Sequence, residues 1–176
     1  LSPLVGIHNT ENILCALLIS HLNGIEQHVV EEILQSFRGL AHRVEQVRRL
    51  NGITFLNDSK ATNVDATRRA LESIEKNVIL IAGGKDKGGS YKVIADLMHK
   101  VKGMVLIGEA KERIYEELGS LTNTYIEKDL DSAVSAAFRI ADAGDIVLFS
   151  PMCSSYDMFS DYKQRGNRFK EIVEKL

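Results

Sequence analysis

A short polar segment at residues 57–63 carries the residue types best suited to chemistry in this sequence. It reads NDSKATN, follows the apolar run 53–56 and precedes a helical pattern that begins at Val64. In open α/β sheets, ligands bind where a strand passes into a helix. Asn63 is expected to cap that helix, but a carboxylate, an ammonium group and two hydroxyls are more polar groups than a cap requires. The segment therefore predicts a binding site for a polar ligand.

Two further loops also follow apolar runs, and in a parallel sheet all three would open on the same edge. Residues 83–89 form a glycine-rich loop (GGKDKGG), and residues 150–156 form a loop with serines and a cysteine (SPMCSSY). Glycine backbone can approach an anion closely, and lysine offers a point charge for a carboxylate or phosphate. The glycine-rich loop matches neither GxxxxGK[ST] nor GxGxxG, so a simple flexible turn is the alternative.

The other candidates for chemistry are weaker. Cys153 has no histidine-based pattern beside it that would make it a nucleophile. Ser154 and Ser155 lie in no GxSxG motif and are expected to cap the last helix. Cys15 lies in an apolar helical pattern and is expected in a core. The histidines show no metal-ligand spacing, so no metal site is predicted.

Two polar pairs stand outside these loops. Asn9 and Asn12 could hydrogen-bond a base such as adenine, because a carboxamide offers both donors and an acceptor. Alternatively, Asn9 or Thr10 would cap a helix. His42 and Arg43 lie where the sequence pattern changes. Neither pair identifies a site by itself.

Composition argues against several classes of function. A net charge of −2 over 176 residues gives no electrostatic basis for binding nucleic acid or an anionic membrane. No apolar run approaches the ~20 residues that span a bilayer. Two cysteines and no visible signal peptide favour a cytoplasmic location. The chain opens at Leu1 without Met and soon enters a helical pattern, so we expect it to be part of a longer protein.

Hydrophobic periodicity predicts a helical hairpin, with helices at 10–23 and 27–37, followed by alternating strands and helices. An antiparallel pair comes first, with a turn at Asn51-Gly52. The wholly apolar run 78–82 is expected to be central and buried on both faces. This alternation predicts an α/β fold with a mostly parallel sheet flanked by helices. The predicted strands are 43–48, 52–57, 78–82, 104–107, 124–126 and 145–149, and the later helices are 64–75, 90–101, 109–118, 130–142 and 157–175.

Taken in order, the polar segments resemble those of the Mur ligases over nearly the whole chain. The matching segments are HNxxN at 8–12, GLAHR at 39–43, NDSKATN at 57–63, GGKDK at 83–87, and the run 150–159 that leads into QRG at 164–166. The DSKATN segment is similar to that of the branch of the family that adds D-glutamate. Branches that add other amino acids carry a different loop there.

The resemblance implies two parts. Residues 1–39 would be the C-terminal helices of the family's central ATPase domain, and residues 40–176 would be its C-terminal Rossmann-like domain. The P-loop, the magnesium ligands and the carbamylated lysine of the family would lie in the missing part of the central domain.

The resemblance also implies an ATP-dependent amide-bond ligase of peptidoglycan synthesis. In the family, ATP phosphorylates the substrate carboxylate, here that of UDP-N-acetylmuramoyl-L-alanine. The amine of D-glutamate then attacks the acyl-phosphate and gives an amide. Mg²⁺ would be bound by the missing central domain. The 176-residue chain would bind D-glutamate and part of ATP without being active alone.

Individual roles follow from the same resemblance. The residues implied to contact ATP are Asn9, Asn12, His42, Arg43 and Asp58. The residues implied to hold D-glutamate are Lys60, Thr62, Lys87, Ser155, Tyr156 and Tyr162. A dicarboxylate needs fixed cations and hydroxyl donors, which agrees with the second set. No catalytic residue is assigned within this chain. The family often has Phe where Tyr162 stands and a smaller or aliphatic residue near Tyr156.

Three other interpretations stay open. A folylpolyglutamate synthase-like ligase shares the domain plan, although the DSKATN segment argues against it. A non-catalytic nucleotide-binding α/β module would need a phosphate-binding fingerprint. A regulatory or interaction domain would not need lysines that converge at one edge. A GxxxxGK[ST] loop upstream of Leu1 would settle the class.

Overall fold

The computed structural model describes residues 7–37, 39–75 and 77–176. The chain divides into two compact units, Leu1–Leu40 and Ala41–Leu176, and each is described by itself. None of the described helices is long and apolar enough to cross a membrane.

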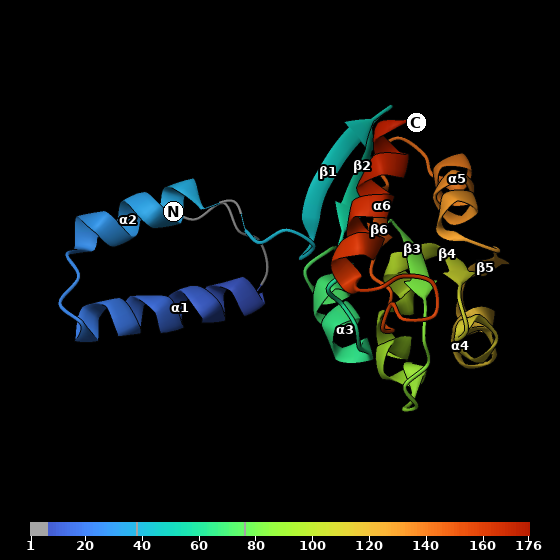
Figure 1. Cartoon of the computed structure of the whole chain (residues 1–176), viewed down its shortest axis with the longest axis horizontal. Coiled ribbons are helices and arrows are strands. Elements are labelled where there is room, and N and C mark those ends of the chain that lie inside the picture. Colours follow the sequence, from blue (N-terminus) through green and yellow to red (C-terminus); the bar gives the residue numbers. More distant parts are fainter. Residues whose placement is uncertain (1–6, 38, 76) are drawn as a thin grey trace. The chain divides into compact units, whose positions relative to one another are not determined.

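The first unit contains two helices, α1 (Ile7–Leu22) and α2 (Gln27–Ser36), drawn in blue in Figure 1. Because α1 already includes Asn9 and Thr10, the prediction that one of them caps this helix is wrong. Cys15 is exposed, and its predicted place in a core is also wrong. Two short helices cannot enclose a core by themselves. The exposed apolar side chains of this unit include Leu14, Leu18, Leu22 and Ile33.

The second unit is built on a six-stranded sheet. The strands are β1 (Glu45–Leu50), β2 (Ile53–Asn57), β3 (Val78–Gly83), β4 (Val101–Ile107), β5 (Asn123–Ile126) and β6 (Ile146–Phe149). Their order is β1-β2-β6-β3-β4-β5; β1 and β2 are antiparallel, and every other neighbouring pair is parallel. Asn51 and Gly52 form the hairpin turn with φ angles of 51° and 82°, the backbone typical of Asn-Gly turns. The predicted α/β fold with a mostly parallel sheet is confirmed.

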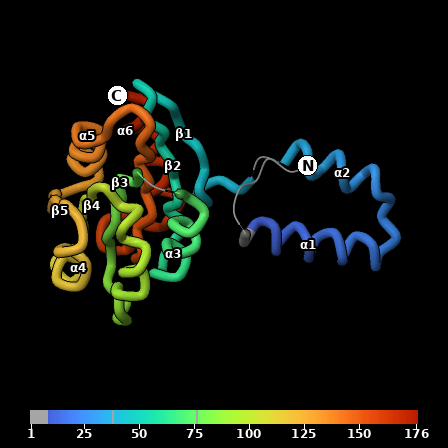
Figure 2. The backbone as a smooth tube through the Cα atoms, turned by 180° about the vertical axis from the view of Figure 1, so that it is seen from behind, coloured from blue at the N-terminus to red at the C-terminus, as the bar shows by residue number. Residues whose placement is uncertain are grey.

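Helices cover both faces of this sheet (Figures 1 and 2). They are α3 (Val64–Glu72), the 3-10 helix η1 (Tyr91–Lys100), α4 (Lys111–Leu118), the short 3-10 helix η2 (Gly119–Leu121), α5 (Leu130–Ile140) and α6 (Tyr162–Glu174). α3, η1 and α4 share one apolar core with side chains such as Leu80 and Met104. α5 and α6 share a second core with Ile81 and Phe149. All of β3 is buried because both of its faces are covered, as predicted.

The helix predicted at 90–101 has a different geometry from an ordinary α-helix. It is η1, a 3-10 helix of 10 residues. Its buried residues are Tyr91, Ile94, Leu97 and Met98. The first three are spaced by three residues, as in one face of a 3-10 helix, but the set with Met98 also fits an α-helix, so the apolar spacing does not distinguish the two.

The last helix begins later than predicted, at Tyr162 instead of 157. Asp161 is its N-cap, and the Asp161 carboxylate accepts a hydrogen bond from Gln164 N at 2.7 Å. The prediction that Ser154 and Ser155 cap this helix is wrong. Ser154 instead forms a β-bridge with Lys85 of the glycine-rich loop, well before α6 begins at Tyr162.

Candidate functional site

The three polar loops leave neighbouring strands at one edge of the sheet. They follow β2, β6 and β3, which are adjacent and parallel. Main-chain hydrogen bonds join the loops to one another: Asp58 N donates to Phe149 O at 2.8 Å, and Lys85 N donates to Ser154 O at 2.9 Å. A Cβ at Gly84 would lie 2.4 Å from Ser154 O, so this approach requires glycine. The predicted convergence of the three loops is confirmed.

Thr62 and Lys87 line a cavity of about 260 Å³ at this edge. Lys87 Nζ donates to Thr62 O at 3.4 Å, and the lysine is exposed. Asn63 caps α3 as predicted, because its side chain accepts a hydrogen bond from Ala66 N at 2.9 Å. The cavity thus presents an ammonium group that contacts the main-chain carbonyl of Thr62, and Thr62 belongs to the same lining. An ammonium group suits a carboxylate.

Lys60, His42 and Tyr162 form a second group. Lys60 Nζ lies 4.0 Å from the centroid of the Tyr162 ring, and the His42 ring packs edge-on against the same ring at 6.0 Å. Asn57 Nδ2 donates to His42 Nδ1 at 3.0 Å. Burial lowers the pKa of His42, which favours the neutral imidazole that accepts this bond. A cation over an aromatic face is attracted by the ring quadrupole, so Tyr162 helps to fix the Lys60 ammonium group.

Asp58 is buried at the end of β2, with only 6% of its surface exposed. One carboxylate oxygen accepts a hydrogen bond from Ser150 Oγ at 2.7 Å, and the other accepts one from Val44 N at 3.3 Å. Burial raises the pKa of the Asp58 carboxyl to about 7, although these bonds and the charge of Arg43 oppose the rise. Asp58 is therefore a buried acid that titrates near neutral pH.

Asp58→Asn is expected to remove a pH dependence of stability. The Asp58 pKa rises from 3.8 when unfolded to about 7 when folded, so the folded state holds a proton that the unfolded state has lost. The free energy of unfolding of the 176-residue chain should therefore fall as pH rises through this window, by on the order of 4 kcal/mol from this group. Urea titrations of both proteins at several pH values give the difference profile. Parallel profiles for the two proteins would contradict the assignment.

The remaining predicted residues lie in different settings. Ser155 is buried in the third loop, and its carbonyl accepts hydrogen bonds from the backbone of the following turn. Tyr156, next in the loop, is 72% exposed. Arg43 is exposed beside the second group. Asn9 and Asn12 lie on α1, in the first unit, and are described with that unit alone.

Arg165, on α6, links the first polar loop (57–63) to the third (150–156). The side chain is fully buried, and its Nη2 donates to Ser59 O at 2.9 Å and to Cys153 O at 3.0 Å. Burial lowers the pKa of Arg165 to about 10, so it stays charged at neutral pH. Gly166 lets α6 approach, because a Cβ there would lie 2.3 Å from His42 Nδ1. The sequence shows these two residues only as part of the QRG motif.

Cys153 is held in an inert state. Its thiol is buried and lies 3.3 Å from Tyr91 Oη. Burial raises the pKa of the Cys153 thiol to about 11, so the reactive thiolate is scarce at neutral pH. The buried, protonated thiol therefore contributes to packing beside Tyr91.

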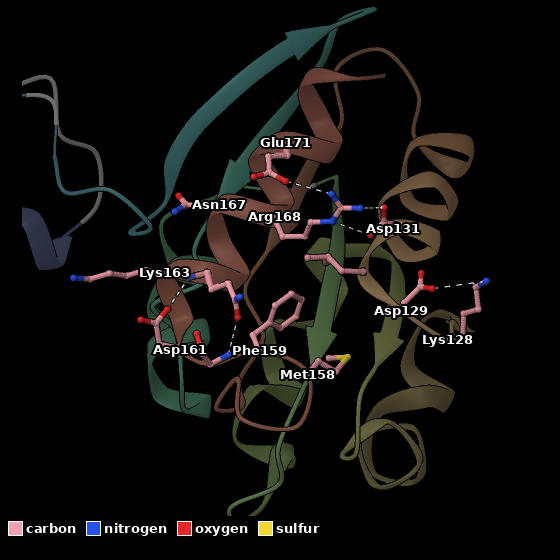
Figure 3. Close-up of a pocket in the computed structure, with 13 residues that line it drawn as sticks. Lys128, Asp129, Asp131, Met158, Phe159, Asp161, Lys163, Asn167, Arg168 and Glu171 are labelled. Atoms are coloured by element: carbon pink, nitrogen blue, oxygen red, sulfur yellow. Dashed lines mark hydrogen bonds and ion pairs between the residues drawn. The ribbon is translucent and has the colours of Figure 1, made fainter.

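A larger groove of about 710 Å³ lies between the start of α5 and the start of α6 (Figure 3). Its charged side chains pair with one another. Arg168 contacts both Asp131 and Glu171, and Lys128 lies 3.8 Å from Asp129. None of the residues predicted to bind ATP or D-glutamate lines this groove. The smaller cavity at Thr62 and Lys87 is therefore the better candidate, despite its size.

Within the described ranges, no group of three or more His, Cys, Asp or Glu side chains could hold a metal ion. This edge of the sheet carries lysines and hydroxyl-bearing side chains, residue types that suit an anion.

Comparison with known proteins identifies the class. Residues 42–153 match the family described as Mur ligase, glutamate ligase domain. Because the match covers more than half of the chain, the chain belongs to the Mur ligase family.

Two of the most similar relatives bear the same name. The chain is 51% identical over 174 residues to UDP-N-acetylmuramoylalanine–D-glutamate ligase of Geotalea daltonii, covering 98% of this chain and 38% of the relative. It is 47% identical over 172 residues to the protein of the same name from Bdellovibrio bacteriovorus, covering 97% of this chain and 37% of the relative. The chain thus spans less than two fifths of the length of these relatives.

Solved structures show the same fold at low identity. A UDP-N-acetylmuramate–alanine ligase from Thermotoga maritima superposes with a TM-score of 0.74 at 18% identity, covering 99% of this chain and 39% of that one. A folylpolyglutamate synthase from Mycobacterium tuberculosis superposes with a TM-score of 0.74 at 13% identity, covering 97% of this chain and 41% of that one. At these identities the likeness concerns the fold alone.

Proposed function

We propose that this chain supplies the D-glutamate-binding part of an ATP-dependent ligase that joins D-glutamate to UDP-N-acetylmuramoyl-L-alanine. The observation that carries the proposal is the placement of Lys87 beside Thr62, at the edge where the three polar loops meet. An exposed ammonium group suits a carboxylate, and a threonine in the same cavity lining can add a hydroxyl donor. The relatives that are 47–51% identical bear the name of this ligase, which supports D-glutamate as the amino acid.

In this proposal, the second unit orients the nucleophile. Lys87 and Lys60 bind the carboxylates of D-glutamate, and Thr62 and Ser155 donate hydroxyl hydrogen bonds to them. Tyr156 and Tyr162 close the pocket. With both carboxylates of D-glutamate bound, its amine points in a fixed direction toward the reacting carbonyl. Fixed orientation of the reacting groups accounts for a large share of the rate of such reactions.

The nucleotide lies on the other side of the reacting carboxylate. ATP phosphorylates the UDP-sugar substrate, and attack by the amine on the acyl-phosphate gives the amide and phosphate, beside ADP. The proposal assigns ATP contacts to His42, Arg43 and Asp58. By the same family resemblance it assigns ATP contacts to Asn9 and Asn12, which are described with the first unit alone. ATP chemistry requires Mg²⁺, and the described residues offer no cluster that would hold it. By the family resemblance, the proposal assigns the metal to the central domain, outside this chain.

The domain assignment belongs to the same proposal. Residues 1–39 are the last helices of a central ATPase domain, and residues 40–176 are the C-terminal domain. The exposed apolar side chains of α1 and α2 support this assignment, because they need a further surface to cover them. Both cysteines are free thiols, which agrees with a cytoplasmic location.

The alternative amino-acid ligase is the folylpolyglutamate synthase type. It shares the fold, as the M. tuberculosis structure shows, but only at 13% identity. The higher identity to the D-glutamate ligases favours the first proposal, and substrate choice separates the two.

A chimera tests the function directly. Residues 1–176 replace the corresponding 38% of the Geotalea daltonii relative, and ADP release is measured with UDP-N-acetylmuramoyl-L-alanine. We expect release that depends on D-glutamate, and none with L-glutamate and a folate. The 176-residue chain alone, which has no GxxxxGK[ST] segment, should release no ADP. A folded chimera that ignores D-glutamate, or the isolated chain turning over ATP, would overturn the proposal.

A further inference from the structure

Among the described residues, none lies close to where a side chain would stand at the tip of the glycine-rich loop, at Gly88 and Gly89. Gly88 and Gly89 adopt positive φ angles of 76° and 90°, and a Cβ at either position would meet no atom within 4 Å. Glycines lose more backbone freedom on ordering than any other residue. Lys87, which precedes them, is exposed. Something outside the loop must therefore hold this lysine where a ligand can use it.

We propose that Arg113 and Glu117, on α4, are positioning residues that hold Lys87 in place to bind the carboxylate of D-glutamate. The inference rests on the proposed function of Lys87. It adds two residues, from a helix that carries none of the predicted ligands.

Arg113 holds the loop on both sides of Lys87. Its Nη1 lies 2.9 Å from Asp86 Oδ2 and 3.2 Å from Asp86 Oδ1, and its Nη2 donates to Gly89 O. Asp86 Oδ1 also accepts hydrogen bonds from Gly88 N at 3.0 Å and from Tyr91 Oη at 3.1 Å. One guanidinium group thus contacts the loop on both sides of Lys87.

Glu117 fixes the far end of the loop. Its Oε2 accepts hydrogen bonds from Ser90 Oγ at 2.8 Å, Tyr91 N at 2.7 Å and Lys92 N at 3.2 Å. Its other oxygen lies 3.4 Å from Arg113 Nε, one helical turn away. Arg113 and Glu117, which we call the brace, therefore hold each other and both ends of the segment 86–92.

The same brace is linked to the third polar loop. Tyr91 Oη lies 3.3 Å from Cys153 Sγ, and the Arg113 guanidinium lies over the Tyr91 ring at 5.4 Å. Cys153 is two residues before Ser155, another candidate ligand. Through Tyr91, the brace fixes the glycine-rich loop relative to the loop that carries Ser155.

The exposure of the brace makes it separable from folding. The side chains of Arg113, Asp86 and Glu117 are 37%, 25% and 17% exposed, and partly exposed ion pairs contribute little to global stability. Lys85 and Lys87, the basic neighbours of Asp86 in the loop, point away from this network: Lys85 pairs with Glu109, and Lys87 reaches Thr62. Weakening the brace should therefore loosen the loop and leave the fold intact.

The test is Arg113→Gln in the active full-length protein or chimera. We expect KM for D-glutamate to rise roughly five- to tenfold, with KM for ATP and Tm close to those of the unchanged protein. This rise is smaller than that for a lost charge-assisted hydrogen bond to the substrate, because Arg113 acts through Lys87. Arg113→Lys should restore part of the affinity. Arg139→Gln is the matched control, because Arg139 is exposed on α5, on the opposite face of the sheet.

A double-mutant cycle with Lys87→Ala decides whether Arg113 acts through Lys87. If it does, Arg113→Gln should have little further effect on the KM for D-glutamate when Lys87 is already Ala. An equal effect in both backgrounds, or a fall in Tm that accounts for the change, would overturn the inference. If Lys87→Ala itself leaves the KM for D-glutamate unchanged, the proposed function of Lys87 fails first, and the inference falls with it.

Discussion

Lys87→Ala in the full-length protein is expected to raise KM for D-glutamate roughly ten- to a hundredfold, with a much smaller change in KM for ATP. The side chain is exposed at the shared edge, and within the described part of the chain its hydrogen bond is to the Thr62 carbonyl, at 3.4 Å. This long contact leaves the ammonium group available to bind an anion. A charge-assisted hydrogen bond contributes about 1.5–3 kcal/mol, which corresponds to that change in affinity. Steady-state kinetics with each substrate varied in turn measure both constants.

The matched control for this experiment is Lys175→Ala. Lys175 is also exposed, but it lies at the C-cap of α6, at the opposite end of that helix from Tyr162. We expect its kinetics to match those of the unchanged protein. If Lys87→Ala raises both KM values equally, Lys87 serves the whole site and not D-glutamate, and the assignment of its role is wrong.

The placement of the polar loops was predictable from the sequence because it depends on strand order and direction. The wholly apolar run at 78–82 required a central strand covered on both faces, and alternation with helices required parallel neighbours. Once β2, β3 and β6 are parallel neighbours, Thr62 and Lys87 come out at the same edge. The two residues are 25 positions apart in the sequence, but the order and direction of the strands bring them to the same edge.

The brace on α4 was not predictable in the same way. Arg113 and Glu117 are spaced one helical turn apart, which by itself indicates only an ordinary pair on a helix surface. Their contacts with Asp86 and Ser90 span 27 residues and depend on how α4 docks against η1. No local pattern encodes that docking angle, so the sequence gives no signal for these residues.

The predicted starts of β1 and α6 were wrong, and for β1 the reason is that contacts between distant residues outweigh local conformational propensity. The first strand begins at Glu45 instead of 43, because His42 and Val44 have φ angles of 67° and 47°. These left-handed conformations are uncommon for residues other than glycine. His42 is held there by its contacts with Asn57 and Tyr162. α6 starts late because Asp161 caps it, with its carboxylate accepting a hydrogen bond from Gln164 N.

Phe169→Ala is expected to destabilise the second unit by about 3–5 kcal/mol, the usual cost of deleting a buried aromatic ring. Phe169 is fully buried on α6 and stacks on Phe149, with ring centroids 4.9 Å apart. Phe149 is the last residue of β6, directly before the third polar loop. This stack therefore joins the helix that carries Arg165 and Tyr162 to the strand that carries the loop.

Urea unfolding of the 176-residue chain, followed by circular dichroism, measures this loss. Phe169→Leu keeps most of the apolar volume and should cost less than about 2 kcal/mol. Tyr156→Ala removes an aromatic ring that is 72% exposed and should change stability by only about 0.5 kcal/mol. The loss in Phe169→Ala is expected to remove the contact between α6 and the loops as well, because Arg165 lies one turn earlier on the same helix. An unfolding midpoint equal to that of the unchanged chain would show that this stack does not hold α6 on the sheet.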